Sequence, residues 1–112
     1  MAIRRSYTAV VERNVLWRGE FATEPYEAAW ASEAIFFVRA LDVRPGFSGQ
    51  AQVQISPDGI HWADEGTTVN LPGKKDAVSF CKVRHFGGWL RLSGKIKPGD
   101  GITVLVSLAL KE

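Results

Sequence analysis

Apolar and polar residues alternate along much of the chain, which is the pattern of β-strands that are buried on one face. The clearest case is residues 50–56, where three apolar residues share one face and three glutamines share the other. The turn sequence Ser56-Pro57-Asp58-Gly59 follows, and its Gly can adopt the positive φ that such a turn requires. We therefore predict a β-hairpin in which residues 60–63 return beside the first strand.

Two other segments are expected to form the centre of the core. Residues 34–41 are apolar on both faces except at Arg39, as in a strand in the middle of a sheet or under a second layer. Residues 102–110 place a run of apolar side chains on one face: Ile102, Val104, Val106, Leu108 and Leu110.

The remaining segments complete an all-β pattern. Further strands are expected at residues 3–12, 16–21, 77–83 and 89–92, a long loop is expected after Gly66, and residues 27–31 could form a short helical turn. Seven or eight short strands separated by Gly and Pro turns predict an antiparallel, jelly-roll-like β-sandwich. No linker or internal repeat interrupts the pattern, so residues 1–112 are expected to form one domain.

Three segments of the chain resemble known proteins: VQISPDGIHW at residues 53–62, FGGWLRL at residues 86–92 and TVLVSL at residues 103–108. Together they resemble the later half of discoidin-like, galactose-binding-type jelly rolls, and they are also similar to small β-sandwiches of phage virions. The resemblance implies a shared fold. It assigns no ligand residue, because the first half, where the ligand-binding loops of discoidin-like domains mainly lie, shows no match. The chain also lacks the cysteine pair that commonly ties the termini of those domains.

Composition and charge narrow the classes of partner. The 112 residues are 46% hydrophobic, and their net charge of +2 combines −3 in residues 1–65, from 6 Lys and Arg against 9 Asp and Glu, with +5 in residues 66–112, from 8 against 3. So small a total disfavours nucleic acid as a partner. No apolar stretch is long enough to span a membrane, and no signal peptide is recognised, so the protein is expected to be cytoplasmic as synthesised and then incorporated into a particle.

The sequence contains little that could catalyse a reaction. His61 lies beside a turn and His85 precedes Phe86-Gly87-Gly88, so neither belongs to a nucleophile motif. Cys81 lies in an expected strand and is interpreted as a small buried hydrophobic residue. The spacing of these residues matches no zinc site, and no glycine-rich phosphate loop is present. We therefore predict a protein that is not an enzyme and needs no metal or cofactor.

The four tryptophans are the best indication of a binding site, because an exposed Trp or Tyr offers a flat apolar face to a sugar or a protein. Trp62 and Trp89 belong to the strand patterns and are expected in the core. Trp17, Tyr26 and Trp30 lie in less regular sequence and are the candidate binding residues. Tyr26 and Trp30 are the pair most expected to be exposed, although core packing fits their sequence equally well.

These observations predict a non-catalytic structural or interaction protein. It is expected to form a homo-oligomer or to dock onto a larger particle, as a virion-type structural or decoration protein does. The closing strand supports this reading, because its second face still offers Leu105 and Ala109 to a partner. The oppositely charged halves support it too. The alternative is a carbohydrate-binding module in which the three candidate aromatic residues stack on a glycan.

Overall fold

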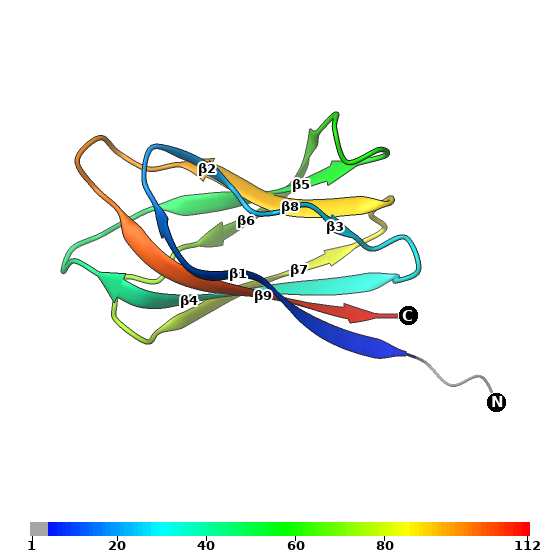
Figure 1. Ribbon diagram of the computed structural model, residues 1–112, viewed down its shortest axis with the longest axis horizontal. Helices are drawn as coiled ribbons and strands as arrows, with labels where there is room; N and C mark the ends of the chain where they lie inside the picture. The colour runs from blue at the N-terminus through cyan, green and yellow to red at the C-terminus, as the bar shows by residue number, and fades with distance from the viewer. Residues whose placement is uncertain (1–4) are drawn as a thin grey trace.

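The computed structural model describes residues 5–112, which form nine β-strands in two antiparallel sheets packed face to face (Figure 1). The strands are β1 (Ser6–Trp17), β2 (Glu20–Ala22), β3 (Tyr26–Glu27), β4 (Glu33–Val43), β5 (Gln50–Ser56), β6 (Ala63–Asn70), β7 (Val78–Arg84), β8 (Trp89–Lys95) and β9 (Ile102–Lys111). One sheet has the order β1-β9-β4-β7, and the other has the order β2-β8-β5-β6, with β3 also paired to β8. The predicted antiparallel β-sandwich is confirmed, with nine strands where seven or eight were expected.

Strands from opposite ends of the chain pair with each other. β1 lies beside β9, while β2 and β3 both lie beside β8. This pairing of the first strands with the last ones is the connectivity of a jelly roll. The start of β1 and the end of β9 therefore lie together at one corner of the molecule, where Ser6 is opposite Lys111 (Figure 1).

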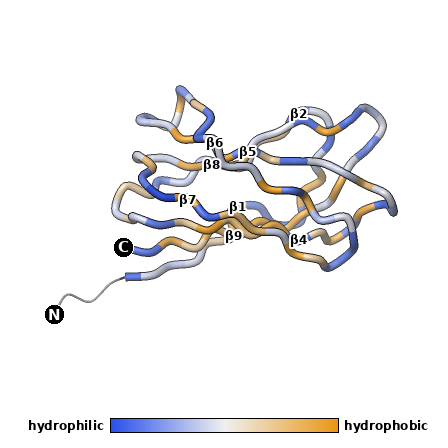
Figure 2. The backbone as a smooth tube through the Cα atoms, turned by 180° about the vertical axis from the view of Figure 1, so that it is seen from behind, coloured by the Kyte–Doolittle hydropathy of each residue, from blue (hydrophilic) through white to orange (hydrophobic). Residues whose placement is uncertain are grey.

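The hydrophobic core lies between the two sheets. β4 lies between β9 and β7, and β9 lies between β1 and β4, so the expectation that these two segments are central is confirmed. Figure 2 shows hydrophobic residues concentrated along both strands. The most deeply buried core residues of the two sheets include Phe36, Val38, Val53, Leu90, Leu92, Val104, Val106 and Leu108.

The predicted hairpin is present as β5 and β6, but its turn is longer than expected. The return strand begins at Ala63, so residues 60–62 belong to the turn. Gly59 adopts a φ of +79°, as expected, and the side chain of Ser56 is buried beneath the turn, where its Oγ accepts a hydrogen bond from the Gly59 N–H. The loop expected after Gly66 begins later, because β6 continues to Asn70.

The N-terminal third differs most from the prediction. Residues 6–17 form one long strand with two register shifts, and Asn14 at φ +55° lies within the irregular stretch. Residues 3 and 4 of the strand expected at 3–12 lie outside the described residues. The helical turn expected at residues 27–31 is wrong: β3 ends at Glu27, and a hydrogen bond from the Ala31 N–H to the Ala28 carbonyl closes a simple turn.

Candidate functional site

The outer face of the four-stranded sheet carries an apolar surface that no part of residues 5–112 covers. We call it the apolar face, and its residues are Val10, Ile35, Phe37, Val78, Phe80 and Leu105. Phe80 is 57% exposed, Val78 is 54% exposed and Val10 is 44% exposed. The ring centroids of Phe37 and Phe80 lie 6.2 Å apart. Large apolar side chains gathered on one exposed face are typical of an interaction surface.

Ion pairs flank the apolar face at both ends of its part of β4. At one end Arg84 Nη2 lies 3.5 Å from Glu33 Oε1, and at the other end Arg39 Nη2 lies 2.9 Å from Asp76 Oδ1. All four side chains are substantially exposed. Such exposed pairs contribute little to the stability of a fold, so these charged groups remain open to a partner.

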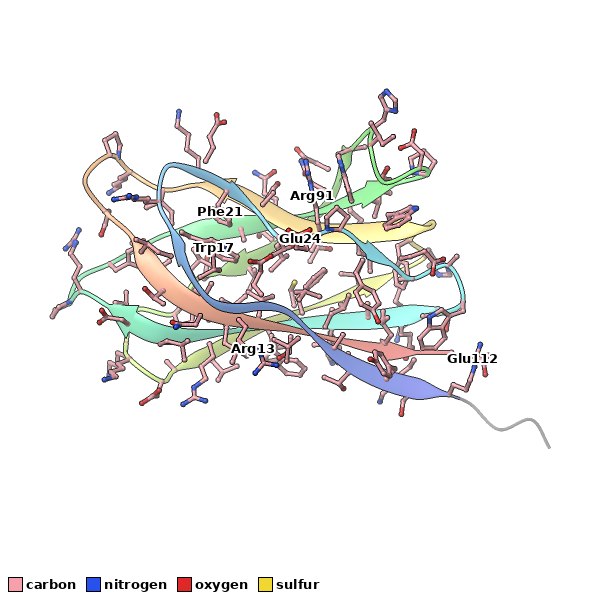
Figure 3. The ribbon with its side chains drawn as sticks, viewed as in Figure 1. Arg13, Trp17, Phe21, Glu24, Arg91 and Glu112 are labelled. Carbon is pink, nitrogen blue, oxygen red and sulfur yellow. The ribbon has the colours of Figure 1, made fainter. Side chains whose placement is uncertain are left out.

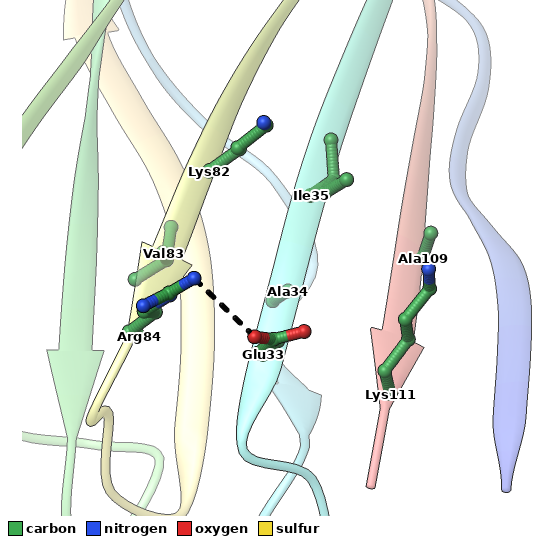
Figure 4. Close-up of a pocket in the computed structure, with 8 residues that line it drawn as sticks. All are labelled: Glu33, Ala34, Ile35, Lys82, Val83, Arg84, Ala109 and Lys111. Atoms are coloured by element: carbon green, nitrogen blue, oxygen red, sulfur yellow. Dashed lines mark ion pairs between the residues drawn. The ribbon is translucent and has the colours of Figure 1, made fainter. Parts of the chain in front are cut away.

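Two shallow hollows give the apolar face its relief. One, of about 190 Å³, lies beside the Glu33–Arg84 pair and includes Ile35, Lys82 and Lys111 (Figure 4). The other, of about 280 Å³, is lined by residues from all four strands of the sheet: Thr8, Phe37, Arg39, Val78, Leu105 and Ser107. A flat sheet face with hollows at two places can receive protruding side chains from a partner.

The outer face of the five-stranded sheet is polar instead, and hydrogen bonds hold its side chains in place. Arg91 Nε donates to Gln54 Oε1 over 2.7 Å, and Gln54 Nε2 donates to Asp64 Oδ1 over 2.9 Å. In the amide orientation that satisfies both groups, the Gln52 side-chain nitrogen donates to Asp64 Oδ2 over 3.2 Å. The chain of bonds thus connects β8, β5 and β6.

A groove of about 490 Å³ runs over this network between β2 and β5. We call it the polar groove, and its lining includes Glu20, Ala22, Gln52, Gln54, Arg91 and Ser93. The Arg91 guanidinium carbon lies 4.2 Å from the centroid of the Trp62 ring, which fixes the side chain from its other side. Partial burial of Arg91 lowers the pKa of its guanidinium from the ordinary value. The groove therefore presents donors and acceptors that are already oriented.

Trp17 does not form an exposed binding surface, so that expectation is wrong. Its side chain lies between the sheets, where it is 3% exposed and stacks on Phe21 with 4.1 Å between ring centroids (Figure 3). Within the described residues, its indole Nε1 is the buried side-chain polar atom that has no hydrogen-bond partner. Trp17 ends β1 opposite Ile102, on the inward side of the sheet, and this pairing explains its burial.

Tyr26 and Trp30 are not the freely exposed pair that was expected. Both are partly buried and pack against the core. The Arg5 guanidinium carbon lies 5.0 Å from the centroid of the Trp30 ring and so covers part of its surface. Burial raises the pKa of the Tyr26 hydroxyl, and nearby Tyr7 raises it further. The structure therefore does not form an open aromatic platform from the three candidate residues.

The expectation that Trp62 and Trp89 lie in the core is also wrong. Both are partly exposed and lie outside the buried cluster. Trp62 precedes β6 and lines a hollow of about 430 Å³ with Ile55 and Pro57. The Trp89 ring lies against Gly59, where a Cβ atom would be 3.2 Å from it. Trp62 was expected on the return strand of the hairpin, but the longer turn places it before β6, outside the core.

The reactive side chains are dispersed. Cys81 is buried as predicted, and burial raises the pKa of its thiol to about 11, so the thiolate is scarce at neutral pH. His61 is bound to Asp58, with 2.7 Å between Nδ1 and Oδ2. Within residues 5–112, no three His, Cys, Asp or Glu side chains are grouped closely enough to hold a metal ion. The same residues contain no helix with the length and hydrophobicity that a membrane crossing requires.

Sequence reasoning found only part of the apolar face. It identified Leu105 on the second face of the closing strand, but it missed Phe80, Val78 and Val10. Phe80 precedes Cys81 in β7, so strand alternation places the two side chains on opposite faces. Once Cys81 was expected to be buried, this alternation could have indicated that Phe80 is exposed. No protein-family model matches the chain, and no curated protein matches it significantly in sequence.

Proposed function

We propose that this chain is a non-catalytic interaction protein that associates with further copies of itself through the apolar face. The observation that carries the proposal is the exposure of Val10, Val78 and Phe80 on one face of a single sheet. Such association would make the chain a building unit or a coat component of a larger particle, for example a virion.

The size of the face supports a specific contact. Together with the flanking ion pairs, its outward residues span about six residue steps along the strands and three spacings between strands, or about 20 Å by 14 Å between Cα positions. With the width of the side chains added, the footprint is roughly 500 Å² for each copy, so about 1,000 Å² in total is at the lower end for specific interfaces. We expect reversible association rather than an obligate dimer.

Charge supports a second copy rather than a nucleic acid as the partner. The net charge is +2, and each Arg at the edges of the apolar face has a carboxylate within 3.5 Å. A polyanion gains little from so small a net charge, whereas a surface of mixed sign can complement another copy of itself.

Substitution of an exposed residue tests the proposal without disturbing the core. Phe80→Asp places a charge in the apolar face, so we expect it to shift the chain toward the monomer in size-exclusion chromatography with light scattering. Ile60→Asp is the matched control, because Ile60 is 74% exposed but lies in the turn before β6. Equal elution of wild type and Phe80→Asp at all concentrations would refute a role for this face.

The polar groove favours a second candidate function, which is the binding of a neutral glycan. The network of Arg91, Gln54 and Asp64 combines guanidinium, amide and carboxylate groups at adjacent positions. Neighbouring sugar hydroxyls donate and accept hydrogen bonds together, so they match such a set of groups. This candidate differs from the sequence-based alternative, since it uses none of the residues Trp17, Tyr26 and Trp30.

Titration with oligosaccharides tests the second candidate through the fluorescence of Trp62, which is stacked on Arg91. We expect a response that Gln54→Ala removes and Gln50→Ala retains, since Gln50 bonds to Asn70 away from this network. If no glycan on a broad array binds, the groove is an ordinary solvated face.

A further inference from the structure

We propose that two copies pack apolar face against apolar face about a two-fold axis. The axis lies between the four-stranded sheet of one copy and that of the other, and it runs perpendicular to their strands. This inference rests on the proposed function, and it adds which surface of the partner is contacted and how the strands of the two copies are oriented.

The register sorts the outward residues of β4 and β7 into four rows across the sheet. In order along β4, the rows pair Glu33 with Arg84, Ile35 with Lys82, Phe37 with Phe80, and Arg39 with Val78. Asp76 precedes β7 beyond the fourth row, where its backbone N–H donates to the Ala40 carbonyl. On β4 and β7, each end of this face thus carries one Arg and one carboxylate, but their strands are exchanged. Lys111 of β9 lies opposite Glu33 and adds a cation to the first end.

A two-fold axis across the strands places the first row of one copy over the fourth row of the other. Glu33 then meets the partner's Arg39. Arg84 lies over the partner's Val78, next to the partner's Asp76, and can pair with that carboxylate. Because a two-fold contact repeats every pairing, each of these ion pairs forms twice. Complementary signs meet at both ends of the contact, which fixes its register.

The middle rows are complementary in the same arrangement. The second row lies over the partner's third row, so Ile35 contacts the partner's Phe37. Lys82 lies over the partner's Phe80, where its methylene stem covers the ring and its ammonium group can interact with the ring face. Two sheets with nearly aligned strands also correspond to a common mode of sheet packing.

An axis parallel to the strands fits the charges less well. It places β7 over the partner's β1, so Arg84 lies over the partner's Ser6 and gains no carboxylate. It also places β4 over the partner's β9, so Glu33 meets the partner's Lys111, whereas Arg39 lies over the partner's Leu105 and gains no carboxylate. The parallel axis therefore forms two ion pairs across the contact, whereas the proposed axis forms four.

Charge reversal distinguishes the two axes. Glu33→Arg and Arg39→Glu each place like charges together under the proposed axis, so each is expected to raise the dimer dissociation constant by about tenfold or more. In the double variant E33R/R39E, the end with two arginines on one copy faces the end with two carboxylates on the other, and this occurs twice. The variant is therefore expected to associate at least as tightly as the wild type. Sedimentation velocity measures all four proteins, and circular dichroism checks their folding.

The possible outcomes separate this arrangement from the proposed function. If the double variant dissociates, the axis is wrong although association through the face stands, because a parallel axis would bring four arginines together. Single reversals that leave the dissociation constant unchanged also overturn the arrangement. If the wild type is monomeric, the proposed function itself fails. The control is the double reversal E20R/K95E of a cross-strand pair on the outer face of the other sheet. It is expected to leave the dimer dissociation constant unchanged.

Discussion

At the scale of single residues, Asp58 organises the turn between β5 and β6. Its Oδ1 accepts hydrogen bonds from the backbone N–H groups of Ile60 and His61, each over 2.9 Å. The backbone bond of His61, its ring and the backbone bond of Ile60 hold the pKa of Asp58 well below its ordinary value. The ionised carboxylate is therefore the form that the folded turn requires.

The shift predicts how acid affects stability. Because the folded-state pKa of Asp58 is lower than its value of about 3.9 in an unfolded chain, its stabilisation is complete above that pH and is lost as the pH falls toward the folded-state pKa. Asp58→Asn is expected to lower Tm at pH 7 and to make Tm fall less steeply below pH 4. Thermal unfolding followed by circular dichroism measures both. Parallel Tm curves for the two proteins would show that another carboxylate dominates.

Residue-scale prediction succeeded where alternation was uninterrupted and failed where it was not. Cys81 and the inward residues of β9 follow unbroken strands, so their burial was predictable. Trp17 follows two register shifts in β1. Each shift interrupts the alternation of side chains between the two faces of the sheet, so the face of Trp17 cannot be obtained by counting along the strand. Trp62 lies outside the core because β6 begins only at Ala63, three residues later than expected. Sequence alternation carries no signal for either irregularity.

At the scale of elements, β4 is a strand with two different apolar faces. Phe36 points into the core and is 1% exposed, whereas Phe37 points outward onto the apolar face. The sequence predicted a central strand from this double apolar pattern, and the structure supplies the covering layer on one side only. The sequence could not show that one face of β4 is left uncovered. An apolar run indicates that both faces are buried, but it does not show whether the same chain or a partner buries them.

This difference predicts unequal effects of truncation. Phe36→Ala is expected to reduce the free energy of unfolding by about 3–5 kcal/mol, because it removes a buried ring and leaves a cavity. Phe80→Ala is expected to change it by about 0.5 kcal/mol or less in the monomer, as for other surface substitutions. Urea unfolding at a concentration where the chain is monomeric measures both. A large loss for Phe80→Ala would mean that this ring is packed within its own chain.

Short elements were the least predictable. β2 has three residues and β3 has two, and both exist because β8, distant in the sequence, pairs with them. Thr23 lies between them, and its Oγ1 accepts the Leu92 N–H over 3.0 Å, which continues the contact across the break. Such strands depend on long-range pairing rather than on local pattern, so their sequence alone indicates little.

At the scale of the whole molecule, folding mixes the acidic and basic halves. Arg5 pairs with Glu112, Arg39 pairs with Asp76 and Arg44 pairs with Asp100, so each contact joins residues from the two halves. The Arg44 guanidinium also lowers the pKa of Asp100. The separation of −3 and +5 along the sequence is therefore not a separation of surfaces. The useful asymmetry lies between the apolar face and the polar groove, on opposite sides of the sandwich.

Association through the apolar face is the central claim, and sedimentation equilibrium of the unmodified chain tests it most directly. The mass of one chain is 12.3 kDa. As the protein concentration is raised through the micromolar range, the weight-average mass is expected to rise from this value toward twice this value. A mass that stays at 12.3 kDa at every concentration would contradict the claim.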